Sequence, residues 1–396
     1  MASDACVINS LTTYVLEKPP SCIEFLPLDN DFCVIGTYYL DTGDGQECPR
    51  EPGQETNAAQ SRSGSLILFN VNKTKPFVVQ SLHTSYAVLD LHFSSNKPNV
   101  LAVATSIGTI CLFTVDVASQ QDLKLKEVSI IDIARPSILV LSLVWCPSKY
   151  EDGRLAASLS DGSIVILDCD DMQHSRYQEQ CHTLEVWSMA FLPAFDGRSQ
   201  ILLSGGDDSV IRANLVNWRP HDSSGSCGII DKNLILPNQK IHSAGVTAIL
   251  PLTATAATAA TDSGLQITVT GSYDEYIRVL TVPKSSSTSR WSVLAEKRLY
   301  GGVWRLKLIR SWSSQCSDNF SVLASCMHVG VRILTITNSK DDGWTIKESA
   351  KFEEHKSMNY ASDARSEPSG GNTQDCLVVS TSFYDRKLCI WKYTSC

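Results

Sequence analysis

The chain has 396 residues, of which 43% are hydrophobic and 19% are charged, and its formal net charge is −8. An acidic chain without a basic stripe is poorly suited to the phosphate backbone, so direct binding of nucleic acid is disfavoured. No apolar run is long enough to cross a bilayer, and the first residues lack the basic and apolar regions of a secretory signal. We therefore expect a globular protein without a membrane-spanning segment.

The 14 cysteines have no spacing that indicates a metal site or a redox motif. No Cys-x-x-Cys pair occurs, and several cysteines lie inside strand-like runs, where a free thiol behaves as a small hydrophobic group. No His-x-His or His-x-x-x-His spacing is present either. The sequence therefore predicts no metal and no cofactor, and the reduced thiols favour a cytoplasmic location.

In chain order, one short unit occurs seven times. Two β-like runs meet at a polar turn, and the second run of each pair is almost entirely β-branched or apolar. These second runs occupy residues 65–71, 109–116, 163–169, 210–216, 276–282, 329–336 and 387–393. They begin roughly 45–65 residues apart, a period that is typical of a β-propeller of WD-repeat type.

The sequence thus predicts an all-β fold, a single seven-bladed WD40-type β-propeller over residues 1–396. The expected blades span approximately residues 21–71, 87–116, 138–169, 185–216, 245–282, 302–336 and 358–393. A strand-like segment at residues 11–16 precedes them, and we expect it to close the last blade, because closure removes open sheet edges. Polar insertions are expected as surface loops at residues 41–64, 218–240, 253–264 and 366–375.

Turns between the second and third strands of several blades contain Asp, which suits tight turns. In WD repeats such an Asp commonly pairs with a His at the start of the blade. The histidines at that position are His83, His182, His242 and His355. A structural role is the expectation for most of these pairs, since polar groups at the ends of strands are normally satisfied locally.

Four segments in the last three blades depart from what a propeller needs. They are residues 271–278 (GSYDEYIR), 301–305 (GGVWR), 326–330 (CMHVG) and 355–363 (HKSMNYASD). Trp-Arg begins an inner strand, and Cys-Met-His stands where a turn Asp is expected. Departures from local rules tend to mark functional sites.

These segments, in this order, resemble the WD-repeat diphthine methylesterase family, and the CVIGTYYL run that begins at Cys33 is similar to the family's first blade. The close resemblance covers about residues 267–365. It implies hydrolysis of the methyl ester of diphthine, a modified histidine on translation elongation factor 2, to give diphthine and methanol before the final amidation to diphthamide. That factor is then the protein partner, and a monomer is expected.

Ester hydrolysis needs an activated water or nucleophile and a donor for the developing oxyanion. His328 and His355 are candidate general bases, Asp363 is a candidate to orient such a His, and Arg305 is a candidate to hold the carboxyl or the oxyanion. Cys326 lies in an apolar strand, which makes it a poor nucleophile. No Gly-x-Ser-x-Gly elbow is present, and the choice between activated water and a covalent nucleophile stays open.

The resemblance also implies a trimethylammonium group beside the ester. Aromatic faces suit such a cation, so Tyr273, Trp304 and Tyr360 are candidates for a cage, and Asp274 or Glu275 would add negative charge. Each has a plainer interpretation as well: Trp304 as a core aromatic residue and Asp274 as a brace for its turn.

The alternative is a non-catalytic WD-repeat scaffold or substrate adaptor that binds a protein partner, the commonest role of such propellers. The Trp-Asp-x-Arg sequence of some ubiquitin-ligase adaptors is absent, since the corresponding strand ends read IWKY and LDCD.

Overall fold

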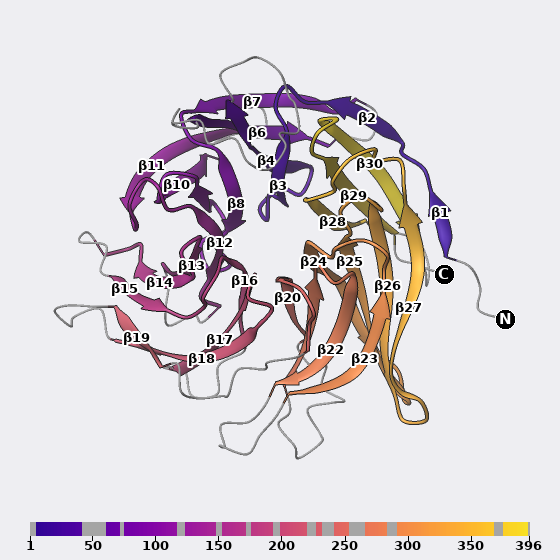
Figure 1. The fold of residues 1–396 in the computed structure, drawn as a ribbon. Coiled ribbons are helices and arrows are strands. Elements are labelled where there is room, and N and C mark those ends of the chain that lie inside the picture. The colour runs from indigo at the N-terminus through magenta and orange to yellow at the C-terminus, as the bar shows by residue number, and fades with distance from the viewer. Residues whose placement is uncertain are drawn as a thin grey trace, which may run out of the picture.

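A computed structural model describes residues 5–41, 61–71, 75–116, 123–147, 153–171, 176–192, 199–219, 227–231, 241–252, 266–282, 291–367 and 375–394. Within these ranges the chain forms strands and turns only, and the strands assemble into seven sheets arranged around a central channel (Figure 1). The expected all-β, seven-bladed propeller is confirmed. Among the described residues, no helix is long and apolar enough to span a membrane.

Each blade runs from an inner strand at the channel to an outer strand at the rim. Blade one contains β3 (Pro20–Phe25), β4 (Phe32–Thr37), β6 (Ser61–Asn70) and β7 (Phe77–Thr84), with β5 (Tyr39–Asp41) also paired to β6. Blade two contains β8 (Val88–Phe93), β9 (Val100–Thr105), β10 (Thr109–Asp116) and β11 (Lys124–Asp132), and blade three contains β12 (Val140–Trp145), β13 (Arg154–Leu159), β14 (Ser163–Asp168) and β15 (Arg176–Gln180). Blade four contains β16 (Val186–Phe191), β17 (Ser199–Gly206), β18 (Ile211–Trp218) and β19 (Gly228–Asp231).

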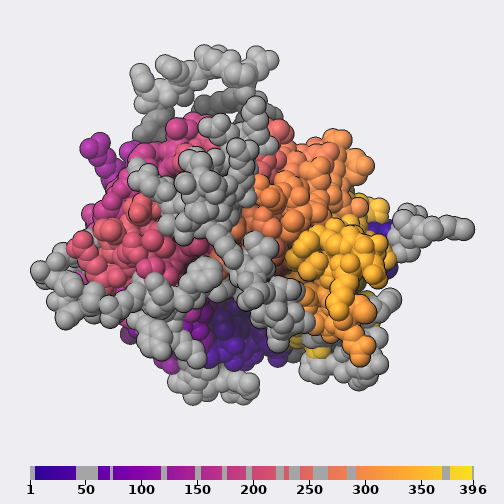
Figure 2. Space-filling view, turned by 90° about the horizontal axis from the view of Figure 1, so that it is seen from below, coloured from indigo at the N-terminus to yellow at the C-terminus, as the bar shows by residue number. Residues whose placement is uncertain are grey.

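The last three blades follow the same order. They are β20 (Val246–Leu252), β21 (Gln266–Ser272), β22 (Tyr276–Val282) and β23 (Ser292–Arg298); β24 (Arg305–Ser313), β25 (Ser317–Ser325), β26 (Val331–Ser339) and β27 (Gly343–Phe352), with β1 (Cys6–Ile8) added at the rim; and β28 (Ser362–Glu367), β29 (Asp375–Ser382), β30 (Lys387–Thr394) and β2 (Thr12–Val15). Figure 2 shows the rim of the ring, with residues of blade four beside those of blades five and six.

The apolar runs become strands because they are covered on both faces. All six residues of β14 are buried, and so are all six of β4. Hydrophobic clusters lie between neighbouring blades, so that one cluster joins Ala104 of blade two to Leu155 of blade three, and another joins Ile35 of blade one to Leu388 of blade seven. Burial against the next blade is what makes seven weakly stable sheets into one ring.

The ring is closed by the N-terminal segment, as expected for residues 11–16. β2 pairs antiparallel with β30, with Thr12 opposite Ile390 and Val15 opposite Lys387. The preceding strand was not expected: β1 pairs parallel with β27, where Cys6 lies opposite Ala350. The N-terminus thus covers the outer edges of two adjacent blades.

Some details differ from the sequence-based boundaries. The expected insertions at 253–264 and, mostly, at 41–64, 218–240 and 366–375 lie outside the described residues. Two of these ranges contain part of a strand: β6 begins at Ser61, within 41–64, and β19, within 218–240, forms the outer strand of blade four. The short Gly-Ile-Ile-Asp run of β19 pairs antiparallel with β18, and its residues alternate between buried and exposed, as expected for a strand with one covered face.

Candidate active site

The channel has two distinct ends because every inner strand runs in the same direction. Trp187 lies at the beginning of β16, and Trp304 and Tyr360 lie just before β24 and β28. Phe93 and Trp145, in contrast, are the last residues of β8 and β12. We call the first end the aromatic end and the second the far end.

Blade four shows what the expected His–Asp pairs do. His182 Nδ1 lies 3.0 Å from Asp208 Oδ1, and its Nε2 lies 2.9 Å from Ser204 Oγ. The imidazole therefore links the turn to the second strand and is fully used inside its own blade. His83, by comparison, is exposed at the end of β7. The turn that follows β9 reads Ser-Ile-Gly and offers no acid to His83, so the expected pair is not found in blade two.

Blade five repeats the arrangement with Asp274, one of the predicted substrate-binding residues. Asp274 Oδ2 lies 3.2 Å from His242 Nδ1 and accepts a hydrogen bond of 2.8 Å from Arg278 Nη1. The Asp274 side chain is only 3% exposed. Burial opposes its ionisation, but the hydrogen bonds and charge of its neighbours outweigh burial and lower its pKa. Asp274 thus faces the inside of its blade.

His355, a predicted general base, occupies the same position in blade seven. Its Nε2 lies 2.8 Å from Ser380 Oγ, and that hydroxyl accepts a hydrogen bond of 2.9 Å from Trp391 Nε1. Burial lowers the pKa of His355 to about 4, and Asp385 only partly offsets this effect. The imidazole is 5% exposed and is stacked edge-on against Phe352, with ring centroids 5.1 Å apart. This placement favours a structural role.

Glu275 and His328 lie on turns at the aromatic end. Glu275 has a positive φ of 68° and forms an ion pair of 2.8 Å with Arg298. His328 is exposed and follows Met327, which has a φ of 43° and pairs with Asn359 in a β-bridge. The bridge fixes the turn that carries His328 against the start of blade seven.

Asp363 and Arg305 both belong to inner strands, which form the wall of the channel. Asp363 is 1% exposed, accepts a 2.8 Å hydrogen bond from the Phe25 backbone N–H and forms a 2.5 Å ion pair with Lys307. Arg305 reaches across the channel from blade six to blade two, where its Nη2 lies 2.9 Å from Asp90 Oδ1.

An acid network that sequence reasoning missed surrounds these two residues. Asp90 accepts a 3.1 Å hydrogen bond from the Leu143 backbone N–H, just as Glu24 accepts one from Phe93. His92 lies between them, 3.0 Å from Glu24 and 3.5 Å from Asp90. Burial favours a neutral imidazole, but the charges of Asp90 and Glu24 raise the pKa of His92, so His92 is a cation.

The three predicted cage residues do come together at the aromatic end. Trp304 is the centre of the group: its ring centroid lies 5.8 Å from that of Tyr273 and 5.0 Å from that of Tyr360. Two aromatic residues that were not predicted extend it, Trp187 at 5.4 Å from Trp304 and Phe383 at 5.4 Å from Tyr360. All five rings are partly exposed. We call these five residues the aromatic cluster.

Negative charge borders the aromatic cluster from blade four. Asp207 Oδ1 accepts a 3.0 Å hydrogen bond from Trp187 Nε1. Burial raises the pKa of Tyr273, and the nearby Tyr360 hydroxyl and the carboxylates of Asp207 and Glu185 raise it further. The cluster therefore combines partly exposed aromatic rings with nearby carboxylates, which is the chemistry that attracts a quaternary ammonium ion.

The described residues offer little support for a thiol or a metal ion. Cys326 is fully buried, and burial raises its pKa to about 12, so its thiolate is scarce at neutral pH. Within the described ranges, no three His, Cys, Asp or Glu side chains gather into a group that could hold a metal ion.

Comparisons with known proteins agree with the fold first. A WD domain, G-beta repeat, model matches residues 174–213. A chain of the crystal structure of the Mitotic Checkpoint Complex is 15% identical, with a TM-score of 0.60, over 99% of this chain and 94% of that one. Chaetomium thermophilum Sqt1, solved bound to the N-terminus of the ribosomal protein L10, is 12% identical, with a TM-score of 0.57, over 97% and 90%. The protein is a WD-repeat β-propeller.

The sequence relatives are more specific. Proteins named diphthine methyltransferase from Schizosaccharomyces pombe and Saccharomyces cerevisiae are 28% and 25% identical, over 98% and 97% of this chain and 99% and 97% of their own lengths. A diphthine methyltransferase homolog from Dictyostelium discoideum is 26% identical over 96% of this chain and 98% of its own length. The chain is thus similar over nearly its whole length to proteins named diphthine methyltransferase, which confirms the resemblance recognised in its last three blades.

Proposed function

We propose that this protein hydrolyses the methyl ester of diphthine methyl ester on translation elongation factor 2, giving diphthine and methanol, as a step of diphthamide biosynthesis in the cytoplasm. The similarity to proteins named diphthine methyltransferase supports a role in that pathway. The observation that carries the reaction itself is the aromatic cluster with its bordering carboxylates, because the substrate has a trimethylammonium group beside the ester. The proposed enzyme acts as a monomer and needs only water as a second reactant.

In this proposal Trp304, Tyr273 and Tyr360 hold the trimethylammonium group. Their rings come from three consecutive blades, and the centroid of Trp304 lies 5.8 Å from that of Tyr273 and 5.0 Å from that of Tyr360, so that the three partly exposed rings are close neighbours. Trp187 and the Asp207 carboxylate complete the site from blade four. A desolvated cation over such faces gains roughly 2 kcal/mol or more per ring at best, which is enough to select a quaternary ammonium over a neutral group.

Arg305 is proposed to bind the carbonyl oxygen of the ester. It directly follows Trp304, and one of its nitrogens is fixed by Asp90 while the side chain remains 24% exposed to the channel. A guanidinium held in this way needs no reorganisation when negative charge develops on the oxyanion. Asp363 supports this wall indirectly, through Lys307 and the backbone of β3.

His328 is proposed as the general base, because it is exposed at the aromatic end and its turn packs beside the cluster. A Cβ placed on Gly302 would lie 2.7 Å from Met327 Sδ and 3.4 Å from Tyr273 Cδ1, so the turn and the ring are close neighbours. His328 takes a proton from water as the water oxygen attacks the carbonyl carbon. The tetrahedral intermediate then expels the methoxy group, which receives that proton and leaves as methanol.

Hydrolysis is favoured over methyl transfer on the grounds of architecture. A transferase requires a site for a nucleotide-like methyl donor, and such sites are typically built at a glycine-rich turn between a strand and a helix. The described residues contain no helix. Hydrolysis starts from the methyl ester and requires only access of water.

The test is mass spectrometry of elongation factor 2 that carries the methyl ester, incubated with the purified protein. The proposal expects loss of one methylene mass from the modified histidine together with release of methanol. Trp304→Ala should abolish most of this activity. Trp312→Ala is the matched control, because Trp312 lies in β24, the strand that directly follows Trp304, but its ring packs against Arg310 at 4.1 Å, away from the cluster. An unchanged mass with folded, factor-bound protein would instead favour the scaffold function.

A further inference from the structure

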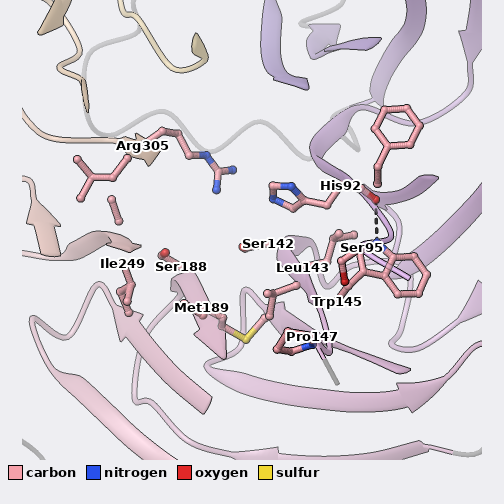
Figure 3. A pocket seen from close by; sticks show the side chains of 15 residues that line it. His92, Ser95, Ser142, Leu143, Trp145, Pro147, Ser188, Met189, Ile249 and Arg305 are labelled. Atoms are coloured by element: carbon pink, nitrogen blue, oxygen red, sulfur yellow. Dashed lines mark hydrogen bonds between the residues drawn. The ribbon is translucent and has the colours of Figure 1, made fainter. Parts of the chain in front are cut away.

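A cavity of about 370 Å³ opens from the channel toward its far end. It is lined by the middle and C-terminal parts of the inner strands of blades two to five and by the start of β24, so it lies beyond Arg305 as seen from the aromatic cluster. Figure 3 shows Arg305 and His92 pointing toward one another from opposite sides of it. Its size lies in the lower range of small-molecule sites.

One wall of the cavity is apolar. Leu143, Met189 and Ile249 line it from three consecutive blades, and the small side chains of Ser142 and Ser188 lie between them (Figure 3). No acidic side chain belongs to the described lining. An occupant with a short hydrocarbon chain would therefore replace water on this side without leaving a charge unpaired.

The opposite wall is cationic toward the cavity. Arg305 is 24% exposed and His92 is 41% exposed, whereas the Asp90 carboxylate behind them is 3% exposed. The acids are already engaged by groups of the protein: Asp90 uses Oδ1 on Arg305 and Oδ2 on the Leu143 N–H, and Glu24 uses Oε2 on both His92 and the Phe93 N–H. The negative charge thus lies in the wall, and the positive charge faces the open space.

Arg305 also has the geometry that a carboxylate requires. Only its Nη2 contacts Asp90, and this contact uses one of the two Nη2 hydrogens, so the other can pair with the neighbouring N–H of Nη1 or Nε, neither of which has a hydrogen-bond partner among the described residues. Two parallel N–H donors of a guanidinium match the two oxygens of a carboxylate. His92 differs, because both of its ring nitrogens face acids, so it contributes charge and not a hydrogen bond.

We propose that this cavity is a binding site for a small monocarboxylate with a short unbranched hydrocarbon chain. The carboxylate lies on the free edge of Arg305 beside His92, and the chain lies against Leu143, Met189 and Ile249. The site does not depend on the esterase function. It shares Arg305 with the proposed ester site but reaches that residue from the far end of the channel.

Isothermal titration calorimetry of the full-length protein tests the proposal with acetate, butyrate and hexanoate as probes. Millimolar binding is expected, with the affinity rising about fourfold for each methylene that enters the apolar wall. Butylammonium, which has the same chain and the opposite charge, should not bind. Phosphate, which lacks the chain, should bind more weakly than butyrate. Equal binding of butyrate and butylammonium, or tighter binding of phosphate, would overturn the assignment.

Two variants locate the site. Arg305→Lys keeps the charge opposite Asp90 but loses the two parallel N–H donors of the guanidinium, so it should weaken the binding of butyrate at least tenfold. Ile249→Glu puts a carboxylate into the apolar wall and should also abolish binding, provided circular dichroism shows that the variant is folded. Trp312→Ala serves as the control on β24. Butyrate binding that survives both substitutions refutes the proposal, and binding by a protein without esterase activity leaves it intact.

Discussion

Replacing His355 with glutamine is expected to flatten the loss of stability that the protein suffers between pH 7 and pH 5. Burial lowers the pKa of His355 from 6.5 to about 4, so the folded protein holds a neutral imidazole while the unfolded chain takes up a proton below pH 6.5. Because the folded pKa is the lower one, the contribution is fully present above pH 6.5 and is lost as the pH falls toward 4. By pH 5 this differential protonation costs about 2 kcal/mol.

Urea denaturation at pH 7 and pH 5 gives the change in the free energy of unfolding between the two pH values, and this change is compared between the wild type and the variant. The wild type should lose about 2 kcal/mol more than His355→Gln between the two pH values. The substitution also removes the hydrogen bond between His355 and Ser380. This loss does not affect the comparison, because the bond is missing from the variant at both pH values. His328→Gln, on an exposed turn, is the matched control and should behave as the wild type does. If His355→Gln and the wild type lose equal stability, His355 is not a buried neutral residue.

Three further outcomes are expected. Trp304→Ala should weaken binding of tetramethylammonium, followed by fluorescence, roughly two- to thirtyfold, whereas Trp312→Ala should not; equal effects would argue against the cage. Cys326→Ser should keep its turnover per folded molecule, since a thiol with a pKa of about 12 is a poor nucleophile, and an inactive but folded variant would reverse this conclusion. Gly330→Ala should lower the free energy of unfolding by more than about 1 kcal/mol, because φ is +81° and the new Cβ would lie 2.3 Å from the Phe352 carbonyl oxygen; an unchanged melting temperature would contradict the strain.

The ring could be predicted because its signals are local. Each blade repeats its own alternation of apolar and polar residues, and the strand-like segment left over before the first blade has only one open edge to fill. β1 carried no such signal. It is three residues long and pairs parallel with β27, a contact that depends on where closure of the ring brings the N-terminus.

The aromatic cluster could be predicted in part. Tyr273, Trp304 and Tyr360 stood out because their segments broke the repeat pattern, whereas Trp187 lies in an ordinary inner strand. A signal did exist, since Val-Trp occurs at the same place in blades four and six, as Val186-Trp187 and Val303-Trp304. Only the curvature of the propeller brings the indole rings of Trp187 and Trp304 to a centroid distance of 5.4 Å.

Most of the ion network of the channel was missed for a different reason. Glu24 and Asp90 each interrupt an apolar inner strand, which alone indicates little, and the predicted Asp363 lies in the polar strand β28. Their shared task becomes visible once neighbouring blades are in place, because each accepts a backbone N–H from the next inner strand. Arg305 finds its acid 215 positions away in the sequence, a distance that no local pattern encodes.

The pairing of β2 with β30 has a consequence for biosynthesis. Thr13 and Cys389 are neighbours in the finished sheet although 376 positions separate them. At the usual rates of translation the ribosome needs roughly 20–80 s to make the chain, so the first strand waits that long for its partner. Until β28, β29 and β30 have been made, β2 is the only strand of blade seven present, and its exposed edge is open to wrong partners. A nascent chain of this kind is therefore expected to need a chaperone until its last residues emerge.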